Sequence, residues 1–138
     1  MKCKDIAKYI SQELVNKGFI VHRYDSYSTC SIYLKLDYGA CNSIRISDHN
    51  GYQHLSYKYN IISGYNNFSG KNWHKDKKGF WRYTCSTNIK ELNKLLDIIY
   101  ADRQYKRSFN NYEKLIEQYK SKIDYNLSFW RECEEIKL

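Results

Sequence analysis

The feature that most constrains the fold is an alternation of apolar and polar residues through residues 43–62, SIRISDHNGYQHLSYKYNII. Successive side chains of a β-strand point to opposite faces of a sheet, so this alternation predicts two strands that each have one apolar face. Between them lies Asn50-Gly51, a dipeptide that strongly favours a two-residue turn between antiparallel strands. The stretch is therefore predicted to form a β-hairpin.

Hydrophobic spacing places the other elements around this hairpin. Apolar residues recur at helical intervals over residues 4–17, which predicts an N-terminal helix that ends at Gly18. Short apolar or alternating runs predict three further strands, at 19–24, 31–37 and 80–86. Helical spacing returns after Asn88, which forms a capping-box pattern with Glu91, and predicts two to three helices.

The order of these elements predicts the fold class. Successive strands joined by hairpin-length links form an antiparallel sheet. We expect an α+β fold with an N-terminal helix, a four- to five-stranded antiparallel sheet, and two to three C-terminal helices packed on one sheet face. The length of 138 residues suits a single domain over 1–138, with the first helix and the sheet in 1–87 and the C-terminal helical part in 88–138.

If helices cover the apolar face of this sheet, its opposite face is basic and aromatic. The formal net charge of +8 attracts polyanions or acidic protein surfaces. Residues 63–79, SGYNNFSGKNWHKDKKG, show no periodicity and are predicted to form a long exposed loop in which Trp73 lies among four lysines. Lysine and arginine neutralise phosphates, and aromatic rings stack on bases. The candidate binding residues are Lys35, Arg45, Lys58, Lys71, Trp73, Lys75, Lys77, Lys78 and Arg82.

These residues also have a purely structural interpretation. Charged side chains cover any sheet face that water reaches, without a ligand being involved. Trp73 can equally fold back from the loop and fill part of the core. The basic face is therefore a hypothesis about binding that competes with an ordinary solvated surface.

No catalytic or metal-binding motif accompanies the basic residues. Asp48, His49 and His54 lie at or beside the predicted turn, and their spacing matches no zinc or metalloprotease motif. Whether these three residues do more than form the turn stays open. Carboxylates are sparse between Glu13 and Glu91, which disfavours a nuclease that holds divalent ions. We therefore expect no enzymatic activity, no cofactor and no metal.

Cysteine usage and the hydropathy of the chain bear on its location. The five cysteines form no C-x-x-C pair. The first residues, MKCKDIAKYISQEL, lack the apolar stretch of a signal peptide, and no run of about 18 apolar residues occurs. We expect a cytoplasmic protein with reduced thiols that does not associate with a membrane.

Three segments carry a resemblance to known proteins: SIYLKLDYG at 31–39, SIRISDHNG at 43–51 and LSYKYNI at 55–61. This pattern is similar to that of small uncharacterised proteins from phages and mobile elements of low-GC Gram-positive bacteria. The resemblance implies a phage or mobile-element origin, and therefore the cytoplasm of a host cell. Some small proteins from that setting inhibit host defence, anti-CRISPR proteins among them. No catalytic or binding residue is implied by the resemblance.

These observations predict a non-enzymatic basic binding protein that engages nucleic acid, or the nucleic-acid-binding groove of a bacterial defence complex. One alternative is a protein that sequesters a cyclic or other nucleotide signal, with tyrosines that clamp the base. Another is a small metal-dependent nuclease that uses Asp37, Asp48 and His49. The C-terminal helices are also candidates for a homodimer interface, although core burial is the simpler interpretation of their aromatic residues, Tyr112, Tyr119 and Trp130.

Overall fold

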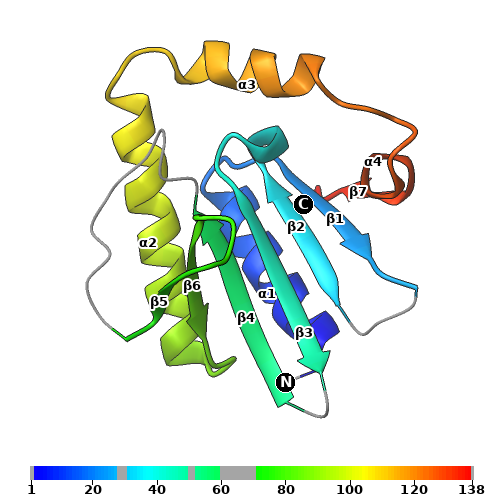
Figure 1. Cartoon of the computed structure of the whole chain (residues 1–138), viewed down its shortest axis with the longest axis vertical. Coiled ribbons are helices and arrows are strands. Elements are labelled where there is room, and N and C mark those ends of the chain that lie inside the picture. The colour runs from blue at the N-terminus through cyan, green and yellow to red at the C-terminus, as the bar shows by residue number, and fades with distance from the viewer. Residues whose placement is uncertain (1, 28–30, 50–51, 60–70, 138) are drawn as a thin grey trace.

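The computed structural model describes residues 2–27, 31–49, 52–59 and 71–137, without the side chains of residues 49, 52–54 and 59 (Figure 1). The predicted turn at Asn50-Gly51 and the side chains of His49 and His54 therefore lie outside the described part of the chain. The helices are α1 (Cys3–Asn16), the short 3-10 helix η1 (Asp37–Gly39), α2 (Ile89–Arg107), α3 (Tyr112–Ser121) and α4 (Ser128–Glu132). The strands are β1 (Val21–Asp25), β2 (Ile32–Leu36), β3 (Ser43–His49), β4 (Tyr52–Tyr59), β5 (Trp73–Lys75), β6 (Trp81–Cys85) and β7 (Glu134–Glu135).

The α+β class is confirmed, and the sheet is larger than predicted. Its seven strands have the order β5-β6-β4-β3-β2-β1-β7, and all neighbouring pairs are antiparallel. The two additional strands are the edge strands β5 and β7, which have three and two residues. Strands this short show no measurable alternation in the sequence, so hydrophobic periodicity does not reveal them.

A carboxylate explains why part of the predicted loop becomes a strand. Asp76 accepts hydrogen bonds from the backbone N–H groups of Lys78 and Phe80, both at 2.9 Å. Aspartate side chains that bind the backbone two residues on stabilise tight turns. This turn brings β5 back along β6, so the prediction of an unstructured loop is wrong for Trp73–Lys75.

The hydrophobic core lies between one face of the sheet and the helices α1 and α2. In Figure 1 α1 lies behind the sheet, and it contacts β1, β2 and β3, while α2 contacts β6. The predicted apolar positions of the strands are buried in this layer: Ile32, Leu34, Leu36, Ile44, Ile46, Leu55, Tyr57, Tyr83 and Cys85. Each large apolar side chain buried here contributes roughly 1.5–3 kcal/mol. Asn88 caps α2 as predicted, because its side chain accepts a hydrogen bond from the N–H of Glu91 (2.9 Å).

The helices α3 and α4 do not lie with α2 on the core side of the sheet. In Figure 1 α3 crosses the end of the sheet, where it contacts η1. The ring of Trp130 in α4 lies 5.2 Å from that of His22, and Phe129 lies 5.8 Å from Tyr24. These strand residues point away from α1 and α2, so α4 packs on the opposite face of the sheet. The sequence-based prediction had placed the C-terminal helices together on one face.

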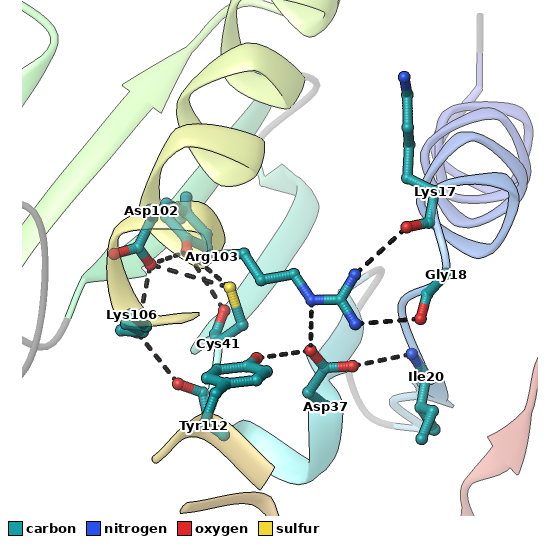
Figure 2. A network of polar contacts seen from close by, with 11 residues as sticks. Lys17, Gly18, Ile20, Asp37, Cys41, Asp102, Arg103, Lys106 and Tyr112 are labelled. Carbon is teal, nitrogen blue, oxygen red and sulfur yellow. Dashed lines mark hydrogen bonds and ion pairs between the residues drawn. The ribbon is translucent and has the colours of Figure 1, made fainter. Parts of the chain in front are cut away.

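Two buried ion pairs lie where the end of α2 meets the turn between β2 and β3, one between the two elements and one within α2 (Figure 2). The first joins Arg103 to Asp37, with 3.0 Å between Nε and Oδ2. The guanidinium also donates to the backbone carbonyls of Lys17 and Gly18 at the end of α1, and the hydroxyl of Tyr112 donates to Asp37. This ion pair therefore connects α1, α2, α3 and the turn.

The second ion pair joins Lys106 to Asp102, with 3.2 Å between Nζ and Oδ2 (Figure 2). The same carboxylate oxygen accepts a hydrogen bond from the hydroxyl of Tyr57 (3.0 Å), and Lys106 donates to the carbonyl of Ala40 (3.0 Å). Buried charges are tolerated when they are paired and hydrogen-bonded in this way. The network fixes the turn that forms one wall of the site described below.

None of the helices that the structure describes combines the length and the hydropathy needed to cross a lipid bilayer.

Candidate anion-binding face

Cross-strand pairing aligns polar residues on the face of the sheet that points away from α1 and α2, which we call the open face. Six of them form a line perpendicular to the strands, the first row: His22, Lys35, Ser43, Lys58, Arg82 and His74. Neighbouring strands lie about 4.8 Å apart, so the row extends over about 24 Å. Pairing thus brings together three of the predicted binding residues, Lys35, Lys58 and Arg82.

A second row lies next to the first on the same face, and it is aromatic at one end and hydroxyl-bearing at the other. Its members are Tyr24, Tyr33, Arg45, Ser56 and Thr84. The guanidinium of Arg45 lies 5.8 Å from the ring centroid of Tyr33 and donates hydrogen bonds to Ser31 Oγ. Arg45 is exposed, so it keeps a cationic group available beside a tyrosine ring.

The members of the first row differ in their charge. Burial lowers the pKa of His22, against the attraction of Glu135 at 3.8 Å, so this imidazole is largely neutral at pH 7. Arg82 is paired with Asp76, with 3.0 Å between Nε and Oδ2. Burial, and after it the charge of Lys58, lowers the pKa of Lys35. The positive charges of Lys35 and Lys58 therefore repel each other.

A pocket of about 380 Å³ lies over the centre of the first row, and we call it the lysine pocket. Its floor is formed by Lys35, Ser43 and Lys58. Its walls come from η1 and the following turn, from the end of α3, from α4 and from the residue before β6, and they consist of Tyr38, Gly39, Asn42, Phe80, Tyr119, Lys122, Ile123 and Trp130. The described residues that line it include three lysines and no carboxylate.

Aromatic rings hold the two floor lysines in place. Lys35 Nζ lies 4.9 Å from the ring centroid of Phe129 and 5.7 Å from that of Trp130. Lys58 Nζ lies 4.2 Å from the ring centroid of Phe80. Aromatic faces attract cations through their quadrupole without neutralising them. The pocket therefore presents two lysine side chains that are held in place by rings and not by carboxylates of the described lining.

The close approach of α3 to the turn requires a glycine at the pocket wall. Gly39 has a φ of +101°, and a Cβ at this position would lie 3.3 Å from the ring of Tyr119. Positive φ is accessible to glycine at little cost. Position 39 therefore favours glycine, which lets Tyr119 of α3 approach the turn and complete this wall of the pocket.

The predicted residues of the 63–79 segment divide between two locations. Lys71, Lys75, Lys77 and Lys78 are exposed at the edge of the sheet around β5. Trp73 pairs with Tyr83 in the register of β5 and β6, and their rings lie 5.2 Å apart in an edge-to-face contact. Its ring packs against the hydrophobic core. Trp73 therefore does not belong to the open face, because the alternation of β5 turns it toward the core.

The carboxylates proposed for a nuclease are not brought together. Asp37 is fully buried and paired with Arg103. Asp48 lies toward the other end of β3, and about 17 Å of strand separate it from Ser43, beside the turn that contains Asp37. Within the described part of the chain, no group of three or more histidine, cysteine, aspartate or glutamate residues could hold a metal ion.

Two important pocket residues, Lys122 and Trp130, were not predicted as part of the face. Trp130 follows a run with helical spacing, which favoured a place in the core. The return of the chain across the open face after α3 depends on tertiary contacts that hydrophobic periodicity does not report.

A scan against protein-family models, a search of curated proteins and a search of solved structures all found no match to this chain, so its function has to be inferred from the open face itself.

Proposed function

We propose that the protein is a non-enzymatic binding protein whose open face holds a single strand of nucleic acid. The observation that carries the proposal is the first row, in which Lys35 and Lys58 have no carboxylate partner among the described residues, beside a second row that offers Arg45 and the ring of Tyr33. Cations contribute affinity by neutralising phosphates, and aromatic rings add stacking of roughly 1–3 kcal/mol per base.

The dimensions of the face support a strand rather than a duplex. Lys35 and Lys58 lie two strands apart in the first row, which corresponds to about 10 Å. Tyr24 already packs against Phe129 of α4, which leaves Tyr33 as the stacking ring of the second row. Tyr33 can stack only on a base that is accessible, and a duplex keeps its bases stacked inside. The combination of a cationic row and an aromatic row therefore favours unpaired nucleotides.

Charge also favours nucleic acid over a protein groove that binds nucleic acid. Such a groove is itself cationic, so it repels a face with uncompensated lysines. An inhibitor that occupied the groove of a defence complex would be expected to carry the opposite charge. Binding to such a complex in the absence of nucleic acid would count against the proposal.

A second candidate function is the sequestration of a free nucleotide, and the lysine pocket is the observation that favours it. Small-molecule sites are concave and combine apolar walls with a few placed polar groups. The pocket has aromatic walls and a lysine-bearing floor. If this is the function, cyclic or other nucleotides should stabilise the protein against heat and nucleic acid should not.

Fluorescence anisotropy with a labelled single-stranded oligonucleotide, measured over a series of salt concentrations, tests the first proposal. The double variant Arg45→Gln/Lys58→Gln should bind roughly tenfold or more weakly, and its salt slope should fall by about two. The matched control is Lys90→Gln/Lys114→Gln, which removes two exposed charges from α2 and α3. The proposal is wrong if the wild type does not bind at low salt, or if both double variants bind equally.

A further inference from the structure

We infer that the lysine pocket is a subsite for a phosphate monoester of a nucleotide, supplied by the end of a nucleic-acid strand or by a free mononucleotide. This inference rests on the proposed function where the ligand is a strand end, and it stands independently where the ligand is a mononucleotide. It adds to the open face a site that distinguishes one chemical form of phosphate from another.

The number of cations in the pocket argues for this ligand. Lys35 and Lys58 contribute two ammonium groups from the floor, and Lys122 contributes a third from the end of α3. An internal phosphodiester of a strand carries a single negative charge, whereas a phosphate monoester carries about 1.5 to 2 near pH 7. Three ammonium groups without a carboxylate are therefore compensated better by a monoester.

The lowered pKa of Lys35 indicates that the positive charges on the pocket floor are not balanced by negative ones. Burial and the neighbouring Lys58 both lower the pKa of Lys35. An anion placed between these ammonium groups would reverse the effect of Lys58 and would compensate for the burial of Lys35. The described lining supplies cations and no anion, so a bound dianionic group would provide the compensating negative charge.

The walls argue for the end of a ligand rather than for a continuous strand. The pocket is bounded by η1 with the end of α3, by Trp130 of α4, and by Phe80. The described residues that line it include none of the second row. For a group that enters from the side of Tyr33 and Arg45, the end of α3 forms the far wall, and a backbone that continued past the pocket would meet it.

The aromatic walls suit the remainder of a nucleotide. Tyr38 and Trp130 stack on each other with ring centroids 6.5 Å apart, and both line the pocket. Lys120 Nζ lies 5.5 Å from the ring centroid of Tyr38, which adds a fourth cation close to this wall of the pocket. A base or sugar that follows the phosphate therefore meets rings and hydroxyl groups rather than carboxylates.

The test compares oligonucleotides of one sequence that end in a hydroxyl group, a 5′-phosphate or a 3′-phosphate, together with a thymidine mononucleotide. The dissociation constant of each ligand is measured with the wild-type protein and with each variant, at a single ionic strength. The pocket variants are Lys58→Gln and Lys122→Gln, and the second changes an exposed residue whose loss should not disturb folding. The matched control is Lys114→Gln, which removes an exposed lysine of α3 that does not line the pocket.

We expect one of the phosphate-ended oligonucleotides to bind at least roughly tenfold more tightly than the hydroxyl-ended one, since charge-assisted contacts are lost without the phosphate. Lys58→Gln and Lys122→Gln should reduce this preference toward unity, and Lys114→Gln should keep it. If only the mononucleotide binds, and the pocket variants abolish its binding, the pocket is a free-nucleotide site and the nucleic-acid proposal is wrong.

Three other results would overturn the inference. If all oligonucleotides bind within twofold of each other and the mononucleotide does not bind, the open face binds nucleic acid but the pocket is not a phosphate site. If neither the oligonucleotides nor the mononucleotide bind, both proposals are wrong. Binding preferences that Lys114→Gln reduces as much as Lys122→Gln does would show a general charge effect and would also contradict the inference.

Discussion

Cationic side chains have opposite surroundings in the buried network beside the turn and in the lysine pocket. In the network, Arg103 is paired with Asp37 and Lys106 with Asp102, and each cation also donates to backbone carbonyls. In the pocket, Lys35 and Lys58 lie against aromatic rings, Lys122 lines the wall, and the described lining includes no carboxylate.

The difference separates charges that serve folding from charges that are open to a ligand. A buried cation without an anion is costly, so a fold that needs a lysine or arginine in its interior supplies a partner. Among the described residues the pocket lysines have no ion-pair partner of this kind and make no hydrogen bond that joins two elements. Their arrangement is explained by an anion that arrives from outside, which is why the comparison supports the proposals above.

The largest loss of stability is expected when a buried ion pair of the network loses one of its partners. Asp37→Asn leaves the buried Arg103 guanidinium without its carboxylate, so the free energy of unfolding should fall by about 3–5 kcal/mol. Urea denaturation measures the loss. The control is Asp25→Asn, which breaks an ion pair with Arg23 on the surface and should cost no more than about 1 kcal/mol. Equal losses in the two variants would show that Asp37 is not a folding requirement.

The same network predicts an alkaline limit to stability. Burial, together with negative groups that include Asp37, raises the pKa of Tyr112 well above its usual range. The unfolded chain ionises this tyrosine above about pH 10 and the folded chain does not, so stability falls as the pH rises above 10, by about 1.4 kcal/mol per pH unit for this group.

Denaturation at pH 9 to 11.5 checks this expectation with two variants. Tyr112→Phe should be less stable at pH 8, by about 1–2 kcal/mol because it loses the hydrogen bond to Asp37, and its stability should fall less steeply above pH 10. Tyr125→Phe changes an exposed residue and should keep the slope of the wild type. An unchanged slope in Tyr112→Phe would contradict the assignment of the alkaline transition.

The open face shows what hydrophobic alternation can predict and what it cannot. Period-two spacing correctly placed Lys35, Arg45, Lys58 and Arg82 on one side of the sheet, since the side of a strand residue follows from its parity. This reasoning could not be applied to Trp73, because a strand of three residues held by the Asp76 turn is too short to produce a pattern. Of the two interpretations that the sequence left open for Trp73, an exposed loop position and a place against the core, the structure has the second.

The walls of the pocket were inaccessible to this reasoning for a different reason. Lys122 and Trp130 reach the open face because α3 is attached to the turn through Tyr112 and Asp37, and α4 then returns over β1. These are contacts between residues far apart in the chain. The paired charges of the network were missed likewise, because Asp102 and Arg103 lie in a helix whose apolar stripe gave no sign of buried ions.

The smallest change in the free energy of unfolding is expected for a substitution in the lysine pocket. Its sign distinguishes the pocket from the buried network, where loss of a charge is destabilising. Lys58→Met keeps an apolar side chain against Phe80 and removes the repulsion of Lys35, so the unliganded protein should be as stable as the wild type or more stable by up to about 1 kcal/mol. The pKa of Lys35, followed by NMR of its side chain, should rise toward its usual value because one of the charges that lowers it is gone. Lys90→Met, on the exposed surface of α2, controls for the loss of a net charge and should leave the pKa of Lys35 unchanged. A loss of stability above about 1 kcal/mol in Lys58→Met would mean that this lysine is held by the fold as Arg103 and Lys106 are, and the distinction between folding charges and ligand charges would no longer apply to the pocket.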